Sequence, residues 1–257
     1  MDEERIKSGI PGLDELIEGG IPRNAIVLVS GAPGSGKSIF SLQFIVEGAR
    51  RGERGLYVSL EQTEEDIKLQ SRRFGWDLDK LIKKGLITLR SYMPAIEVYK
   101  TKEEVIRSIL PLPIDHPRYV WKRYFDQMIY VELEEEFKQK MYTRFVLDSA
   151  STLTLFSNDD YATQKITMFR LIKFIREKKM TALITSELSK DAEWYSRDTV
   201  SEFLVDGIIV LRYIEGEEGF RTLYIPKMRN TRQATAAFPM EITSNGIVVD
   251  SSIEKKV

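Results

Sequence analysis

The sequence predicts an α/β protein with a mostly parallel central sheet, helices on both faces of that sheet, and a C-terminal antiparallel β-meander. Two observations support this prediction. Between residues 25 and 187, short apolar runs alternate with segments whose apolar residues recur at helical spacing. From Gly207 onward, the apolar runs follow one another and are separated by turn residues.

The first strand, loop and helix are expected between residues 25 and 51. Residues 25–30 form an apolar run that Gly31 closes, which is typical of a strand buried on both faces of a sheet. From Lys37 to about residue 51, apolar residues recur at the spacing of an amphipathic helix. The glycine-rich segment between them is therefore predicted to be a loop at the head of a helix.

The next pair of elements repeats this order. Residues 55–61 are predicted to form a second strand, and Thr63 with Asp66 resembles a capping box that opens a helix ending near Phe74. The remaining expected elements are strands at 86–92, 144–150 and 181–187, an amphipathic helix at 161–179, and meander strands near 208–211, 220–225, 240–243 and 247–249.

A single domain over residues 1–257 is the simplest organisation, because no internal repeat is visible. Residues 93–142 interrupt the alternation and are too many for a plain loop. Thr101 with Glu104 fits a further capping box in this segment, and an acidic run follows at 132–136. We expect a helical insertion within the domain.

Composition limits the chemistry of the protein. The 38 basic and 39 acidic residues give a net charge of -1, so the chain lacks the overall positive charge of a dedicated nucleic-acid module. Without cysteine, and with His116 as the one histidine, thiolate and multi-histidine sites are excluded, which leaves Mg2+ as the expected metal. The acidic N-terminus and the lack of a long apolar run predict a cytoplasmic protein without a membrane span. High lysine and glutamate without cysteine is also found in hyperthermophile proteins.

The glycine-rich loop matches the pattern G-x-x-x-x-G-K-[ST] between a strand and a helix. Small residues let consecutive backbone amides turn inward around phosphates, at the positive end of the following helix. The lysine adds a positive charge for the β- and γ-phosphates, and the serine hydroxyl binds Mg2+. We therefore expect ATP and Mg2+ as ligands. The residues predicted to bind them are Gly31, Ala32, Pro33, Gly34, Ser35, Gly36, Lys37, Ser38 and Ile39.

Two acids stand at the ends of predicted strands. Asp148 closes an apolar strand, where a carboxylate has little packing use, and we interpret it as an outer-shell partner of the Mg2+ that Ser38 binds. Glu61 ends the second strand, at the edge where ligands of parallel sheets gather, which makes it a candidate general base for the attacking water. On the residues alone, a turn cap for Asp148 and a helix-start acid for Glu61 are the alternatives.

Several segments together resemble the KaiC and RadA-paralog branch of the RecA-like P-loop ATPases. They are SGIPGLDEL at 8–16, GGIP at 19–22, the glycine-rich loop, Glu61, LDS at 147–149, VDGII at 205–209 and KMR at 227–229. With one such loop, the chain is more similar to single-domain archaeal KaiC-like proteins than to the tandem clock protein. The resemblance implies a RecA-like core that assembles as a ring, commonly a hexamer, with ATP between adjacent subunits.

The same resemblance assigns roles to residues outside the loop. It implies that Glu61 activates the attacking water, whereas Gln62 stands where KaiC-like proteins usually have a second acid, so slow hydrolysis is expected. It also implies that Lys227 and Arg229 reach the γ-phosphate of a neighbouring subunit as a charge clamp. On the residues alone, two exposed cations at a strand edge are the more frequent arrangement.

A γ-phosphate sensor and a DNA-binding loop are the further features of RecA relatives. Ser186 and Glu187 fall at the position that the resemblance implies for the sensor. Residues 188–202 fall where RecA and RadA bind DNA, but this segment carries more acids than bases, which disfavours phosphate contacts. Trp194 and Tyr195 nevertheless offer rings that could stack on single-stranded bases.

Three functions therefore remain open. The first is an ATPase whose ring changes shape with nucleotide and regulates a protein partner, contacted through the insertion at 93–142, where Trp121, Tyr124 and Phe125 alternate with basic residues. The second is a RadA-paralog accessory factor in DNA recombination and repair that binds single-stranded DNA. The third is a scaffold that binds ATP with little turnover.

Overall fold

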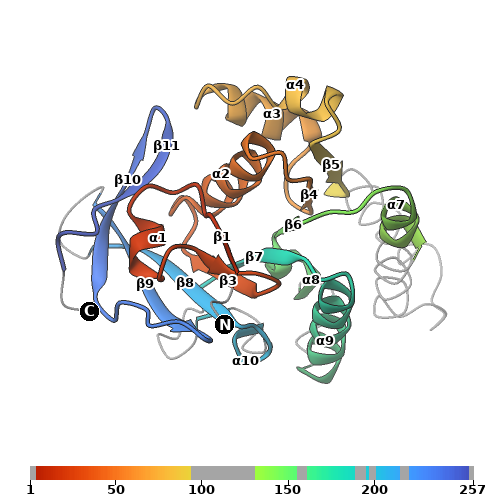
Figure 1. The fold of residues 1–257 in the computed structure, drawn as a ribbon. Helices are drawn as coiled ribbons and strands as arrows, with labels where there is room; N and C mark the ends of the chain where they lie inside the picture. Colours follow the sequence, from red (N-terminus) through yellow and green to blue (C-terminus); the bar gives the residue numbers. More distant parts are fainter. Residues whose placement is uncertain are drawn as a thin grey trace, which may run out of the picture.

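The computed structural model describes residues 4–93, 131–154, 161–188, 195–196, 201–214 and 220–254. Its centre is a nine-stranded sheet with the order β11-β10-β9-β8-β3-β7-β6-β4-β5 (Figure 1). From β8 to β5 in this order, neighbouring strands are parallel, and β9, β10 and β11 extend the same sheet as an antiparallel meander. The strands are β3 (Ile26–Gly31), β4 (Gly55–Ser59), β5 (Ile87–Ser91), β6 (Arg144–Asp148), β7 (Thr181–Glu187), β8 (Gly207–Tyr213), β9 (Arg221–Met228), β10 (Ala237–Thr243) and β11 (Gly246–Val249).

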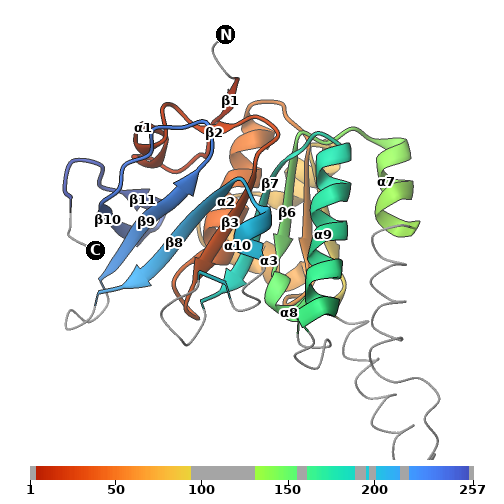
Figure 2. The ribbon, with the colours of Figure 1, turned by 90° about the horizontal axis from the view of Figure 1, so that it is seen from below.

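Helices cover both faces of the sheet, as the sequence predicts (Figure 2). Successive residues of β3 enter two separate cores, because side chains alternate across a strand. Val27 and Val29 pack in the core under α2, and Ile26 and Leu28 pack in the core under α9. The helices are α2 (Lys37–Arg50), α3 (Glu64–Arg72) and α4 (Leu78–Lys83) on the first face, and α9 (Tyr161–Glu177) and α10 (Ser201–Leu204) on the second. In the sequence, α7 (Glu134–Gln139) precedes β6, and α8 (Ala150–Thr154) follows β6 and packs against β7.

A short N-terminal unit packs beside the meander. β1 (Arg5–Ile6) pairs with β2 (Ile21–Pro22) outside the main sheet, and α1 (Leu13–Leu16) lies between them in sequence. Leu13 and Ile17 are fully buried in the core under α2. The sequence did not predict these elements, because runs of two to four residues carry no measurable periodicity.

Arg144 is a fully buried arginine at the start of β6. Its Nε donates to Glu53 at 2.5 Å, and its Nη1 donates to the backbone carbonyls of Phe44 at 2.7 Å and Lys7 at 2.9 Å. The guanidinium also lies 4.4 Å from the centre of the Phe44 ring. This one side chain therefore ties the N-terminal unit and α2 to the central sheet.

Strand direction defines two opposite sides of the sheet, which we call its edges: one holds the carboxyl ends of the parallel strands and the other holds their amino ends. The carboxyl ends of β3, β4, β6 and β7 share one edge, because Gly31 lies opposite Glu187 and Ser59 lies opposite Asp148. β9 runs antiparallel to β8, so Met228 lies opposite Gly207 at the other edge. The residues that follow β3 and those that end β9 therefore lie at opposite ends of the strands.

Two predicted strands were too long. β4 ends at Ser59 rather than Glu61, because the Ser59 hydroxyl donates to the carbonyl of Gln62 and accepts from its amide, which turns the chain. β6 ends at Asp148 rather than at residue 150, where α8 begins. The other strands and α9 agree with the prediction within about three residues.

The predicted insertion at 93–142 is described only at Met93 and from residue 131, where a helical segment continues into α7. The predicted helix at Thr101 and the aromatic residues near Trp121 lie outside the described residues, as do His116 and Trp194. A helical insertion and a single domain therefore stay predictions. Among the described helices, none is both long and apolar enough to cross a membrane.

Candidate functional site

The loop between β3 and α2 has a backbone that requires glycine at its ends. Gly36 has a φ of 108°, in the left-handed region that side chains disfavour, and it directly precedes α2. At Gly31, a Cβ would lie 2.8 Å from the carbonyl oxygen of Leu211, so a larger residue would displace β8. The loop therefore brings backbone amides to the N-terminus of a 14-residue helix, where an anion is stabilised.

Lys37 bends back over this loop. Its Nζ donates to the carbonyl oxygens of Gly31 at 2.7 Å and Ala32 at 3.1 Å. Burial lowers the pKa of Lys37, and the nearby carboxylates of Glu187, Asp148 and Glu61 oppose that shift. Lys37 begins α2, Asp148 and Glu187 end β6 and β7, and Glu61 follows β4, so the fold brings the lysine and the three predicted acids to one edge of the sheet.

Asp148 is held in the interior at the end of β6 and is 2% exposed. It accepts hydrogen bonds from the Tyr57 hydroxyl at 2.7 Å and from the Thr185 hydroxyl at 2.6 Å. Burial and the neighbouring carboxylate raise the pKa of Tyr57 well above its usual value, which keeps the phenol a proton donor. The sequence did not indicate Tyr57 and Thr185, because their roles depend on β4 and β7 flanking β6.

Glu61 lies two residues beyond β4 and is exposed. Its Oε1 accepts hydrogen bonds from the Ser149 hydroxyl and, at 3.0 Å, from the Thr152 hydroxyl. Both donors belong to the segment that follows Asp148, so the two acids are positioned by one stretch of chain. Beside Glu61, the Oε1 atom of Gln62 is buried and has no hydrogen-bond partner in the described part of the chain.

The two candidate sensor residues lie at the same edge. The backbone amide of Glu187 donates to the Ser151 hydroxyl at 2.8 Å, and the hydroxyls of Ser151 and Ser186 are 3.4 Å apart. Ser186 is fully buried, whereas Glu187 is partly exposed and acts on the pKa of Lys37. Of these two residues, only Glu187 carries a charge, and that charge acts on Lys37 of the loop.

Lys227 and Arg229 lie at the opposite edge, where β9 ends. Lys227 donates from Nζ to the carbonyl oxygens of Val205 at 2.7 Å and Glu202 at 3.1 Å. Arg229 is paired with Asp206, with Nη1 3.2 Å from Oδ1. Burial lowers the pKa of Lys227, and the neighbouring charge of Arg229 adds to the effect. The fold thus keeps these two cations together but away from the loop of the same chain.

Mg2+ would find few protein ligands here. The described residues hold no group of three or more histidines or acids that could bind a metal. The Ser38 hydroxyl and the Asp148 carboxylate are the oxygens that the loop and β6 offer. This small set suits Mg2+ held mainly by phosphate oxygens and water, because that ion dehydrates reluctantly and rarely has an all-protein cage.

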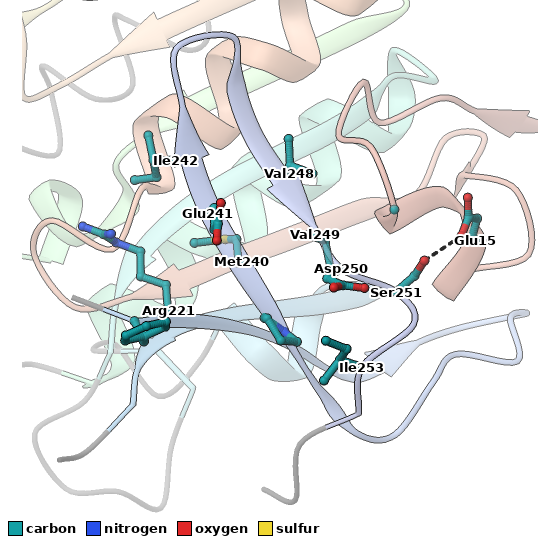
Figure 3. Close-up of a pocket in the computed structure, with 13 residues that line it drawn as sticks. Glu15, Arg221, Met240, Glu241, Ile242, Val248, Val249, Asp250, Ser251 and Ile253 are labelled. Carbon is teal, nitrogen blue, oxygen red and sulfur yellow. Dashed lines mark hydrogen bonds between the residues drawn. The ribbon is translucent and has the colours of Figure 1, made fainter. Parts of the chain in front are cut away.

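A separate hollow of about 1010 Å³ lies beside the meander and α1 (Figure 3). Three of its lining residues are acids: Glu15, Glu241 and Asp250. Its one cation is Arg221, whose Nη2 lies 3.5 Å from the carbonyl oxygen of Gly34. An excess of carboxylates disfavours a triphosphate, so the glycine loop remains the better phosphate site.

A parallel α/β sheet with this loop, an acid at the end of a neighbouring strand and a C-terminal meander defines a nucleotide-binding RecA-like P-loop ATPase fold. The chain belongs to the KaiC ATPase family, because the model of that family matches residues 6–254. This result confirms the fold class and the family resemblance seen in the sequence.

Individual relatives agree with this assignment. A "UPF0273 protein" of Thermotoga maritima is 36% identical over 250 residues, which are 96% of each chain. The circadian clock protein KaiC3 of Synechocystis is 32% identical over 249 residues, but the match spans 45% of its length. Among solved structures, a KaiC-like protein of Pyrococcus horikoshii superposes with a TM-score of 0.78 at 31% identity and covers 96% of this chain and 99% of its own.

Proposed function

We propose that this protein binds ATP with Mg2+ at the loop of residues 31–39 and hydrolyses it slowly. The observation that carries the proposal is the glycine loop at the head of α2, over which Lys37 bends to the carbonyl oxygens of Gly31 and Ala32. The charges of Glu187, Asp148 and Glu61 act on this lysine. Charges of both signs around a phosphate loop are what metal-assisted phosphoryl transfer requires.

Each site residue of the chain that carries the loop has a defined task in this proposal. Backbone amides of the loop and the Lys37 ammonium bind the phosphates, and the carbonyl contacts that Lys37 now makes are replaced by phosphate oxygens. Ser38 is a Mg2+ ligand, and Asp148 fixes the water shell of the ion. Glu61, held by the Ser149 and Thr152 hydroxyls, takes a proton from the attacking water.

Lys227 and Arg229 would complete the site of a neighbouring subunit. Strand β8 has seven residues, so at roughly 3.3 Å per residue the two edges lie about 20 Å apart. Neither side chain can span that distance to reach its own loop. The pair can serve a phosphate only across an interface, which favours a head-to-tail ring, with a hexamer as the favoured size.

Single-stranded DNA binding finds no support among the described residues. Tyr195 is half-buried and packs against the core under α9, so its ring is not free to stack on a base. Gln62 is instead compatible with low turnover, since the residue after Glu61 is an amide and not a second acid. We therefore retain the scaffold with little turnover as the second candidate function.

Calorimetry and phosphate release test this proposal. ATP with Mg2+ should bind the wild type, and Lys37→Ala should lose that binding while it keeps its circular dichroism spectrum. Retention of ATP by Lys37→Ala would overturn the site assignment. Phosphate release by the wild type at the level of the Glu61→Gln variant would favour the scaffold.

Mixed assemblies test the shared site. Arg229→Ala and Glu61→Gln subunits should each be inactive alone and regain part of the activity when mixed, because some interfaces then combine an intact base with an intact clamp. Mass in solution with and without ATP gives the ring size. Fluorescence anisotropy with labelled single-stranded DNA at two salt concentrations checks the DNA function, which would require binding that weakens as salt rises.

A further inference from the structure

Asp206 joins three elements at the edge opposite the phosphate loop. Its Oδ2 accepts a hydrogen bond from the amide of Ile26 at 3.0 Å, where β3 begins. Its Oδ1 lies 3.0 Å from an Arg176 nitrogen at the end of α9 and 3.2 Å from Nη1 of Arg229 after β9. The carboxylate is mostly buried, with 18% of its side chain exposed. Exposure this low makes its hydrogen bonds stronger than those of a surface pair.

The backbone of Asp206 also bonds to two of these three elements, the start of β3 and the segment after β9. Its amide donates to the carbonyl of Ile26 at 2.8 Å, and its carbonyl accepts from the amide of Arg229 at 2.9 Å. Arg229 is therefore attached to Asp206 through both its side chain and its main chain. No other residue in the described part of the chain is paired with the Arg229 side chain in a salt bridge.

The neighbouring segment fixes Lys227 in the same way. The carbonyl oxygens of Glu202 and Val205 accept from its Nζ, and Val205 directly precedes Asp206. Residues 202–206 thus hold both cations at the end of β9. Arg229 keeps about half of its side chain exposed, at 53%, so its remaining donors are available to a second acceptor.

We propose that Asp206 is a positioning residue that presents Arg229 to the nucleotide of the neighbouring subunit. The carboxylate occupies one nitrogen of the guanidinium and fixes its plane, and the other nitrogens face the phosphate. This inference rests on the proposed function, because it requires a clamp that acts between subunits. It assigns a task to an acid that never touches nucleotide.

The first test is the kinetics of Asp206→Asn in the assembled protein. The amide keeps the shape of the side chain but loses the charge that binds Arg229, so kcat should fall roughly tenfold, as expected for one lost charge-assisted hydrogen bond. KM for ATP should change by less than about twofold, since the loop of the same chain is intact. Arg176→Gln, which removes the other cation at Asp206, is the matched control and should keep most of the activity.

Mixed assemblies separate positioning from a general structural defect. Asp206→Asn mixed with Glu61→Gln should regain activity to the same extent as Arg229→Ala mixed with Glu61→Gln. Asp206→Asn mixed with Arg229→Ala should gain nothing beyond the sum of the two proteins alone, because the clamp is impaired in one variant and missing in the other. Recovery in this last mixture, or an unchanged kcat for Asp206→Asn alone, would overturn the inference.

The reference mixture of Arg229→Ala with Glu61→Gln distinguishes the two levels of the proposal. If it gains no activity, the shared site fails and the positioning role fails with it. If it gains activity and the Asp206→Asn mixtures deviate from the pattern above, the positioning role alone is refuted. If Asp206→Asn does not fold, Asp206→Glu, which keeps the charge but displaces it, takes its place in the same mixtures.

Discussion

Replacing Glu61 by glutamine should abolish most ATP hydrolysis without loss of binding. Oε1 of Glu61 accepts from the Ser149 and Thr152 hydroxyls, and the glutamine oxygen can accept the same bonds. Oε2 has no hydrogen-bond partner among the described residues and is the atom free to take a proton from water. A general base contributes about 100- to 10,000-fold to a rate, which corresponds to about 3–5 kcal/mol on the barrier.

Phosphate release under saturating ATP measures this effect directly. For Glu61→Gln, kcat should fall by at least about 100-fold while KM stays within about threefold, since binding groups are retained. Glu64→Gln is the matched control, because Glu64 is an acid in the first turn of the following helix and has no assigned role at the loop. A Glu61→Gln variant with at least half of the wild-type kcat would refute the assignment of Glu61 as the base.

Three further changes test the structure around the site. Arg144→Met should lower the free energy of unfolding by about 3 kcal/mol in urea titrations, because it removes the buried donor that a half-buried carboxylate and two backbone carbonyls share. The exposed Arg54→Met should change it by less than about 0.5 kcal/mol. Gly36→Ala should cost about 2 kcal/mol and weaken ATP binding, and Gly52→Ala, with positive φ but no atom within 4 Å, should cost less. For Lys37, whose pKa is lowered in the folded state, the unfolded chain binds the proton more tightly. Between that lowered value and 10.5, the stability of the nucleotide-free protein should therefore rise with pH relative to Lys37→Ala, and an equal slope in both proteins would contradict the shift.

The local part of the site was predictable from the sequence because it is contiguous. The loop from Gly31 to Ser38 carries its own turn chemistry and its own helix, so one stretch of residues specifies it. Asp148 was predictable for a similar reason, since an acid at the end of an apolar run stands out. The strands themselves follow from apolar runs that the two cores on either side of the sheet require.

The supporting residues were not predictable, because they depend on strand order. Tyr57 and Thr185 meet Asp148 only because β4 and β7 are the neighbours of β6, and no periodicity encodes that order. Asp206 is a similar case: its partners lie on β3, on α9 and after β9. The overlong strand at 55–61 has a local cause, because the Ser59 turn that ends it contains no glycine or proline.

The balance of charge at the loop predicts that a single chain holds ATP poorly. One ammonium, that of Lys37, lies among the carboxylates of Glu187, Asp148 and Glu61. Mg2+ adds two positive charges, whereas the triphosphate brings about four negative ones. The residues of one chain therefore leave an excess of negative charge in a partly buried site. Lys227 and Arg229 of an adjacent copy are two cations that the fold offers at its opposite edge. We infer that assembly and ATP binding stabilise each other, so the apparent Kd for ATP should fall as protein concentration rises, and a Kd independent of concentration would argue for a site complete in one chain.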